Sequence, residues 1–274
     1  METSVMRYRC IAISAALLFA CVSPAAAEDE PRWSLSSSVN YSVGDYGTGK
    51  DTTLIYVPFT LGVKPIDRFT IGLTIPYIYQ TGETIVITGG GVGVRKDKQR
   101  QLGTATQNQV TSTEQGLGDV LLKGQYVLLE ETSVLPEIAP YLKIKFPTAD
   151  SDRGLGTGEF DETVGVDLSK TLFPRFVSYL TLAYTFIGSP AGTTFDNSFG
   201  WSVGAAYLVA QPFSVFAFLD GSTAISPGQA NPLEVRVGAD YRVTQALKIF
   251  GSVSRGLSDG SADWGVSAGL ALRF

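Results

Sequence analysis

Apolar and polar residues alternate strictly along much of this chain, over stretches of roughly ten residues. In the stretch 233–243, one face would carry apolar side chains and the other mostly polar ones: Leu233, Val235, Val237, Ala239, Tyr241 and Val243 against Glu234, Arg236, Gly238, Asp240 and Arg242. Residues 199–209 and 262–274 repeat the pattern. A period of two is that of a β-strand with two unlike faces. No apolar run of 18 or more residues occurs after residue 27, so the pattern predicts an all-β protein without a transmembrane helix.

The predicted strands are long and number about twelve. Soluble strands average about five or six residues, whereas a tilted strand that crosses a membrane needs about 9–11. The stretches that we expect to form strands are 33–43, 52–63, 68–80, 117–129, 137–147, 162–172, 175–187, 199–210, 213–224, 233–243, 246–256 and 262–274. Trp264 and Phe274 stand ten residues apart on one apolar face. That spacing projects to about 25 Å, the height of the apolar band of an outer-membrane barrel.

The connections between these strands alternate between short and long. Short turns are expected at 64–67, 131–136, 173–174, 211–212 and 244–245, and long loops near 44–51, 81–116, 148–161, 188–198, 225–232 and 257–261. Short periplasmic turns and longer outer loops are the rule in bacterial outer-membrane barrels. The sequence therefore predicts a transmembrane antiparallel up-and-down β-barrel of about twelve strands in the bacterial outer membrane.

The first 27 residues have the pattern of a secretory signal peptide. Arg7 and Arg9 precede an apolar segment, 10–21, that is too short to span a bilayer. Ala25-Ala26-Ala27 provides a cleavage site, so we expect a signal peptide over 1–27 and one barrel domain over 28–274. The alternative is a lipoprotein modified at Cys21. Phe274 resembles the terminal aromatic signal by which bacterial outer-membrane barrels are recognised by their assembly machinery, and that machinery is an expected partner.

Composition narrows the chemistry that the chain can perform. The sequence contains no His, and its two Cys, Cys10 and Cys21, both lie in the predicted signal peptide. Catalytic triads that use His and zinc sites that use His or Cys are therefore excluded from the barrel domain. We expect no enzyme activity, no catalytic residue, no metal and no cofactor. The formal net charge is −5, and no basic patch suggests binding to nucleic acid.

Any specific function of a barrel must lie in its lumen or its outer loops. The alternation places several charged and aromatic side chains in the lumen, and the candidates for lining a passage are Tyr141, Lys143, Lys145, Asp167, Phe216, Phe218, Arg236, Asp240 and Arg242. Opposite charges on neighbouring strands could simply pair and stabilise the wall. Alternatively, the charges set selectivity and the aromatic rings stack on an apolar or aromatic solute.

Two of the long loops carry charge. Loop 81–116 contains a run of glycines, 89–91, and a basic run that includes Arg95, Lys96, Lys98 and Arg100. We interpret the basic run as a solvated loop that faces water or anionic lipopolysaccharide. Loop 148–161 carries Asp150, Asp152, Glu159 and Asp161, which could bind a hard cation, although their spacing matches no EF-hand.

The same region carries a family resemblance. Its motifs are Gly116-Leu117-Gly118-Asp119, Lys145-Phe146-Pro147-Thr148-Ala149-Asp150, Gly154-Leu155-Gly156-Thr157-Gly158, Val166-Asp167-Leu168-Ser169-Lys170 and Tyr184-Thr185-Phe186-Ile187-Gly188. Together they resemble the outer-membrane transporter-like family named for the meta-pathway of phenol degradation. That family usually has Gly where this chain has Ala149. The resemblance implies a β-barrel with a role in the uptake of hydrophobic or aromatic compounds, and it supplies no catalytic residue.

These observations lead to one functional interpretation and one alternative. We expect a passive outer-membrane channel or transporter whose partners are membrane lipid, lipopolysaccharide and a small apolar solute. The alternative is a structural or surface-interaction barrel whose lumen is closed by pairs of opposite charges.

Overall fold

The computed structural model describes residues 31–46, 50–82, 85–89, 91–94 and 112–274. Within these ranges, no helix is long and apolar enough to cross a bilayer. The strands are β1 Trp33–Gly44, β2 Thr52–Ile66, β3 Phe69–Gly82, β4 Ile85–Thr88, β5 Gly91–Val94, β6 Ser112–Leu117, β7 Val120–Tyr126, β8 Glu137–Phe146, β9 Asp161–Phe173, β10 Phe176–Ile187, β11 Ser198–Ala210, β12 Phe213–Ser222, β13 Leu233–Arg242, β14 Leu247–Gly256 and β15 Trp264–Arg273.

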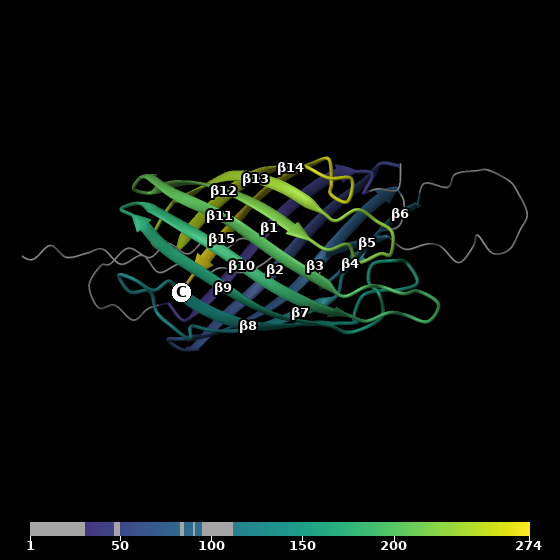
Figure 1. Cartoon of the computed structure of the whole chain (residues 1–274), viewed down its shortest axis with the longest axis horizontal. Coiled ribbons are helices and arrows are strands. Elements are labelled where there is room, and N and C mark those ends of the chain that lie inside the picture. The colour runs from purple at the N-terminus through teal and green to yellow at the C-terminus, as the bar shows by residue number, and fades with distance from the viewer. Residues whose placement is uncertain (1–30, 47–49, 83–84, 90, 95–111) are drawn as a thin grey trace, which may run out of the picture.

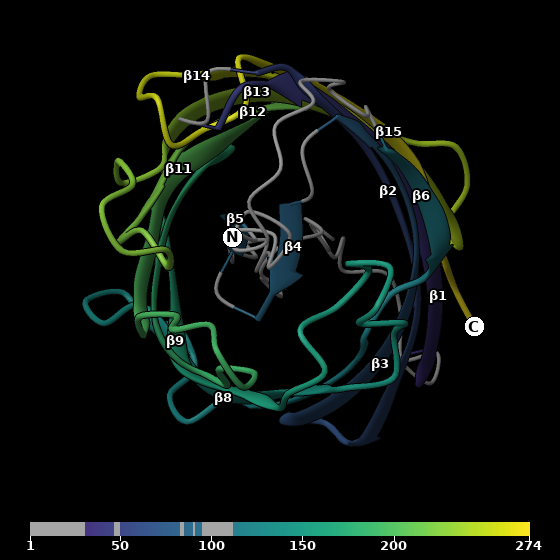
Figure 2. The same cartoon turned by 90° about the vertical axis from the view of Figure 1, so that its right-hand side faces the viewer.

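The long strands form a closed antiparallel barrel (Figures 1 and 2). Each pairs with its neighbours in sequence, and β1 closes the ring by pairing with β15. At the seam, the backbone amides of Trp33 and Phe274 each donate to the carbonyl of the other, at 2.9 and 3.0 Å. Strands β6 and β7 both pair with β3. They are two parts of one barrel strand interrupted at Gly118 and Asp119, so the barrel has twelve strands, as the sequence predicted.

The predicted alternation of connections holds with one exception in length. Four turns are short, 67–68, 174–175, 211–212 and 243–246, whereas the turn predicted at 131–136 is a ten-residue connection, 127–136, because β7 already ends at Tyr126. All five gather at the end of the barrel where the C-terminus lies (Figure 1). The other connections, which join β1 to β2, β3 to β6, β8 to β9, β10 to β11, β12 to β13 and β14 to β15, start and finish at the opposite end. By the rule for outer-membrane barrels, the short-turn end faces the periplasm and the long-loop end faces outward.

The two faces of the strands are also as predicted. On β13, Val237 points away from the lumen and is 47% exposed, whereas Asp240 points inward and is buried. On β15, Val266 and Leu270 are exposed on the outer surface, while Ala271 is buried. The outer surface is therefore an apolar band that lipid would cover, because lipid replaces water around the strands of a membrane barrel.

Two features of the structure were not anticipated. The strand predicted to begin at residue 117 begins at Ser112, because β6 extends the barrel wall beyond the apolar band with polar side chains. The predicted loop 81–116 contains the short hairpin formed by β4 and β5. The expected signal peptide, 1–27, and the basic run from Arg95 to Arg100 lie outside the described residues.

Candidate functional site in the barrel lumen

The barrel encloses a cavity of about 570 Å³. Six of the predicted lumen residues line it: Tyr141, Lys143, Lys145, Phe216, Phe218 and Arg236. Asp167 lies buried behind this lining and contacts Lys123. Asp240 and Arg242 lie nearer the periplasmic end of β13, where Asp240 is 3.8 Å from Lys248. The structure therefore divides the predicted residues between a central cavity and the wall around it.

Four inward-facing aromatic rings each lie over a glycine on the neighbouring strand. The pairs, which are direct cross-strand partners, are Tyr141 with Gly165, Phe218 with Gly204, Phe216 with Gly238 and Phe250 with Gly269. A Cβ atom at any of these glycines would lie within 2.5 Å of the paired ring. Each glycine is therefore required by the close approach of a ring to the backbone.

This pairing explains why the cavity stays open although large rings line it. A ring that lies against the backbone of the wall occupies little of the bore. Phe218 is the centre of the group, with Phe216 at 6.0 Å and Tyr179 at 5.9 Å between ring centroids. We call Tyr179, Phe216 and Phe218 the aromatic platform. All three rings are among the residues that line the cavity, although they are only 5–7% exposed, so they offer a flat apolar solute ring edges and parts of ring faces.

A network of charges occupies the wall formed by β7, β8 and β9. Asp167 accepts hydrogen bonds from Gln125 at 2.7 Å and Thr181 at 2.7 Å, and it pairs with Lys123 at 3.3 Å. The Lys123 ammonium also lies 3.9 Å from the centre of the Tyr141 ring. These contacts provide hydrogen-bond partners for most of the buried polar atoms of this network, so we interpret the network as one that stabilises the wall.

A second group of contacts folds the outer loop 147–160 towards the lumen. Lys145, only 2% exposed, lies 2.8 Å from Asp119 and 3.4 Å from Asp161. The other oxygen of Asp119 accepts hydrogen bonds from the backbone amides of Thr148 and Ala149. A Cβ at Gly156 would lie 2.6 Å from Asp119. The glycine, aspartate and lysine positions of the motifs in 116–158 thus hold the loop against the wall.

The β4–β5 hairpin is attached to the same wall. Figure 2 shows it inside the ring of strands when the barrel is seen end-on. The Asp161 carboxylate accepts a hydrogen bond from the Gly89 amide at 2.7 Å, and the Lys143 ammonium donates to the Gly89 carbonyl at 2.9 Å. Ile87, Thr88 and Gly89 line the cavity, so the hairpin contributes to its outer part.

Apolar packing completes the outer end of the cavity. Tyr46, Leu54, Ile78, Leu155 and Ala262 form a buried cluster there. The Tyr46 hydroxyl lies 3.0 Å from the Ser42 hydroxyl. Burial raises the pKa of Tyr46, and the hydrogen bond with Ser42 partly opposes that increase.

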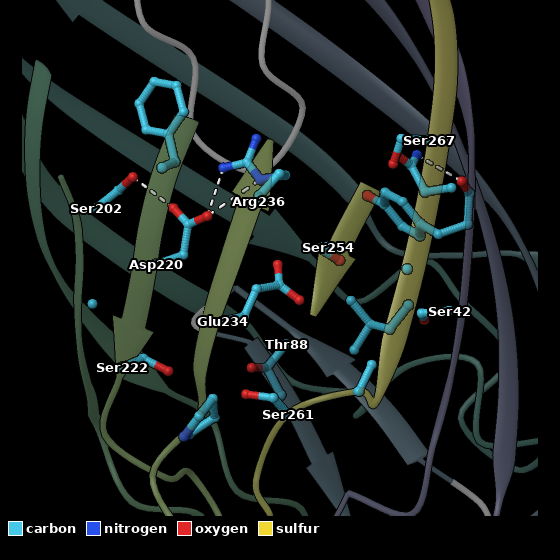
Figure 3. A pocket seen from close by; sticks show the side chains of 18 of the residues that line it. Ser42, Thr88, Ser202, Asp220, Ser222, Glu234, Arg236, Ser254, Ser261 and Ser267 are labelled. Carbon is cyan, nitrogen blue, oxygen red and sulfur yellow. Dashed lines mark hydrogen bonds and ion pairs between the residues drawn. The ribbon is translucent and has the colours of Figure 1, made fainter. Parts of the chain in front are cut away.

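A third polar group lies on β12 and β13 (Figure 3). Arg236 donates to one oxygen of Asp220 through Nη2 at 2.7 Å and Nε at 3.2 Å, and Ser202 donates to the other oxygen at 2.6 Å. Glu234 is the direct cross-strand partner of Asp220 and is hydrogen-bonded to Ser254. Arg236 lies over the Phe218 ring at 5.3 Å.

The structure gives no support to a metal site. In the part of the chain that it describes, no group of three or more His, Cys, Asp or Glu side chains is arranged to hold a metal ion. Of the acidic residues in loop 148–161, Asp150 accepts hydrogen bonds from the amides of Asp152 and Arg153, and Asp161 pairs with Lys145.

The fold and the lumen define the chain as an outer-membrane β-barrel with a solute-sized cavity. Residues 92–274 match the family model described as the putative MetA-pathway of phenol degradation. The chain belongs to this family, as the motifs around Asp119 and Asp150 indicated. No curated protein matches the chain in sequence.

Several solved structures share the fold. The COG4313 outer membrane channel from Pseudomonas putida F1 is 16% identical, with a TM-score of 0.65 over 92% of this chain and 100% of that one. The NanC porin is 10% identical, with a TM-score of 0.53 over 88% and 100% of the two chains. The KdgM porin is 7% identical, with a TM-score of 0.51 over 88% and 99%. These similarities confirm the barrel fold.

Sequence reasoning missed parts of the lumen. Tyr179 and Phe250 line the cavity but were not among the candidates, although both lie in predicted strands. Gly204 and Gly238 were placed on the inward face, but their role depends on which ring stands opposite. That information lies in the register between strands, which the pattern within one strand does not contain.

Proposed function

We propose that this barrel carries small hydrophobic or aromatic solutes passively across the outer membrane. The observation that carries the proposal is the aromatic platform, whose three rings line a cavity of about 570 Å³. Aromatic rings in the wall of a lumen form favourable contacts with flat apolar solutes. Membership of a family described by phenol degradation supports the same class of solute. The proposal assigns no chemical reaction to the barrel.

Transport can be tested in a Gram-negative host that expresses the full chain. The aromatic dye 1-N-phenylnaphthylamine is largely excluded by an intact outer membrane and becomes fluorescent when it enters. We expect faster dye entry than in cells with an empty vector. The amount of folded barrel in the membrane is measured by its heat-modifiable gel mobility. Dye entry equal to that of the empty vector, with folded barrel present, would contradict the proposal.

Two substitutions distinguish a role of the aromatic platform in transport from a role of the outer surface. Phe218→Leu keeps an apolar side chain but removes the ring, and we expect slower dye entry, because stacking contributes about 0.5–1.5 kcal/mol per ring. Phe199→Leu is the matched control, because Phe199 is 43% exposed on the outer face of β11. Equal dye entry through both variants would show that the platform is not the path.

One observation favours the alternative, a closed barrel with a structural or surface role. The β4–β5 hairpin is attached inside the outer end through Gly89. Single-channel recording in a planar bilayer distinguishes the two. A barrel closed by its hairpin gives no conductance, and Lys143→Met, which removes the hydrogen bond to the Gly89 carbonyl, would then produce conductance.

A further inference from the structure

A row of three uncharged polar side chains crosses the lumen wall on β1, β15 and β14. Asn40 is the direct cross-strand partner of Ser267, and Ser267 is the direct partner of Ser252. All three residues line the cavity. Figure 3 shows Ser267 on the same side of the cavity as Ser254 and Ser42, which belong to the next row outward. Since neighbouring strands lie about 4.8 Å apart, the row spans about 10 Å of the wall.

The hydrogen-bonding capacity of this row is not used up by the protein. Asn40 donates through Nδ2 to the Tyr56 carbonyl and to Ser38 Oγ, both at 2.9 Å. A carbonyl can only accept, so the contact with Tyr56 identifies the amide nitrogen and leaves Oδ1 as an acceptor. Within the ranges that the structure describes, Oδ1 has no donor, and the hydroxyls of Ser252 and Ser267 have no hydrogen-bond partner. The row therefore offers two hydroxyls and one amide oxygen to a ligand in the cavity.

The direct neighbours of the row are uncharged. On the same three strands, the lumen-facing residues before and after it are Phe250, Ser254, Gly265, Gly269, Ser38 and Ser42. The charged side chains that line the cavity balance one another, with Lys143, Lys145 and Arg236 against Asp119, Asp220 and Glu234. The cavity thus favours neither sign of charge, and an uncharged solute enters it without the cost of removing a charge from water.

The three groups of the row are complementary to hydroxyl groups on a ligand. The Asn40 oxygen can only accept a hydrogen bond, whereas the hydroxyls of Ser252 and Ser267 can both donate and accept. A ligand hydroxyl can donate to Asn40 and can exchange hydrogen bonds with either serine. An ether or a ketone cannot donate, and an ammonium group cannot accept. Because the row is about 10 Å wide, a ligand needs more than one hydroxyl to engage all of it.

We infer that the row formed by Asn40, Ser267 and Ser252 is a binding site for small neutral polyols. The cavity of about 570 Å³ is much larger than the volume of about 30 Å³ that one water molecule occupies, so it has room for such a ligand. The inference goes beyond the proposed function and does not rest on it. The row lies on β1, β15 and β14, whereas the aromatic platform lies on β10 and β12. The lumen thus has a second, polar class of ligand.

The inference can be tested with two probes that share one carbon chain and differ in their number of hydroxyls, xylitol and pentane-1,5-diol. Binding to the full chain in nanodiscs is measured by saturation-transfer difference NMR, with empty nanodiscs as the blank. We expect xylitol, which has more hydroxyls, to bind more tightly. The dissociation constants of the two probes should differ by about threefold to tenfold, the factor that one neutral hydrogen bond contributes.

Two variants assign the binding to the row. Ser252→Ala and Ser267→Ala each remove a hydroxyl and widen the cavity, so a site that held xylitol by size alone would not be weakened. We expect each variant to weaken xylitol binding by about threefold to tenfold. Ser37→Ala is the matched control and should change nothing, because Ser37 lies on the outer face of β1 opposite the exposed Leu270 and Phe59. Folding of each variant is checked by heat-modifiable gel mobility.

The outcomes separate this inference from the proposed function. A xylitol signal no larger than that of empty nanodiscs overturns the inference, and so does tighter binding of pentane-1,5-diol than of xylitol. Unchanged xylitol binding in both Ser252→Ala and Ser267→Ala overturns the assignment to the row. The proposed function is measured by dye entry, so a barrel that admits the dye but binds no xylitol loses only this inference.

Discussion

Substitution of Gly204 by alanine tests the pairing of ring and glycine on which the open lumen depends. An added Cβ would lie 2.3 Å from Cδ1 of Phe218 and 2.4 Å from the backbone oxygen of Ala217. The backbone oxygen is fixed by the sheet, so the strands must separate slightly and the Phe218 ring must turn into the cavity. Gly200 is the matched position, because it lies on the same strand and lumen face with nothing within 4 Å of its added Cβ.

The expected magnitude follows from the contacts that move. Overpacking a close-fitting site costs about 1–3 kcal/mol, and turning Phe218 weakens its contacts with Phe216 and Tyr179, each about 0.5–1.5 kcal/mol. Replacing glycine by alanine also lowers the conformational entropy of the unfolded chain, which raises the unfolding free energy by about 0.4–1 kcal/mol. We therefore expect Gly204→Ala to lose about 2 kcal/mol of unfolding free energy. Gly200→Ala should be neutral or slightly stabilising.

The assay is equilibrium urea unfolding of the barrel refolded in lipid vesicles, followed by tryptophan fluorescence. The double variant Gly204→Ala with Phe218→Ala should lose less than the sum of the two single variants, because removing the ring removes the clash. Equal unfolding free energies for Gly204→Ala and Gly200→Ala, within about 0.5 kcal/mol, would refute the reasoning. Strictly additive losses in the double variant would locate the clash in the backbone alone.

Two further predictions concern the lipid face and the outer loop. Val237→Arg, near the middle of β13 on the outer face, should cost about 2–4 kcal/mol in the same unfolding assay, whereas Val243→Arg, just beyond the periplasmic end of the strand, should cost about 0–1. Similar losses at both positions would contradict the depth assigned to Val237. Asp119→Asn should cost about 1–3 kcal/mol, because it removes a charge from the buried contact with Lys145. Asp150→Asn, which keeps an oxygen for its two backbone amides, should stay within about 0.5 kcal/mol; a comparable loss there would count against the special role of Asp119.

The barrel could be predicted because each strand is recognisable from its own sequence, without knowledge of the strands with which it pairs. Each long strand must place apolar side chains towards lipid, and this requirement appears in the sequence as alternation, as in 233–243. The same signal fails where lipid no longer constrains the strand. In β6, the residues from Ser112 to Gln115 are polar on both faces, because this part projects beyond the apolar band.

The β4–β5 hairpin has a signal in the sequence. That signal was missed because the loop 81–116 was interpreted as having no regular structure. Thr88 and Gly91 are cross-strand partners, and in the sequence a run of glycines, 89–91, stands between short segments that contain Ile and Val. A pair of glycines in this setting is typical of a tight β-hairpin. Its attachment inside the lumen could not be predicted, because Asp161 and Lys143 lie far from Gly89 in the sequence.

The pairing of Phe218 with Gly204 also has a consequence for how barrels of this kind diversify. The two residues face each other directly across neighbouring strands, so exchanging them would preserve the total side-chain volume at that level of the wall. The ring would then be rooted one strand away, and its orientation towards the lumen would change, while the backbone stayed the same. The exchange takes two substitutions, and the intermediate after the first would carry either two rings or two glycines, so the recognition surface can move around the circumference only when both partners change together.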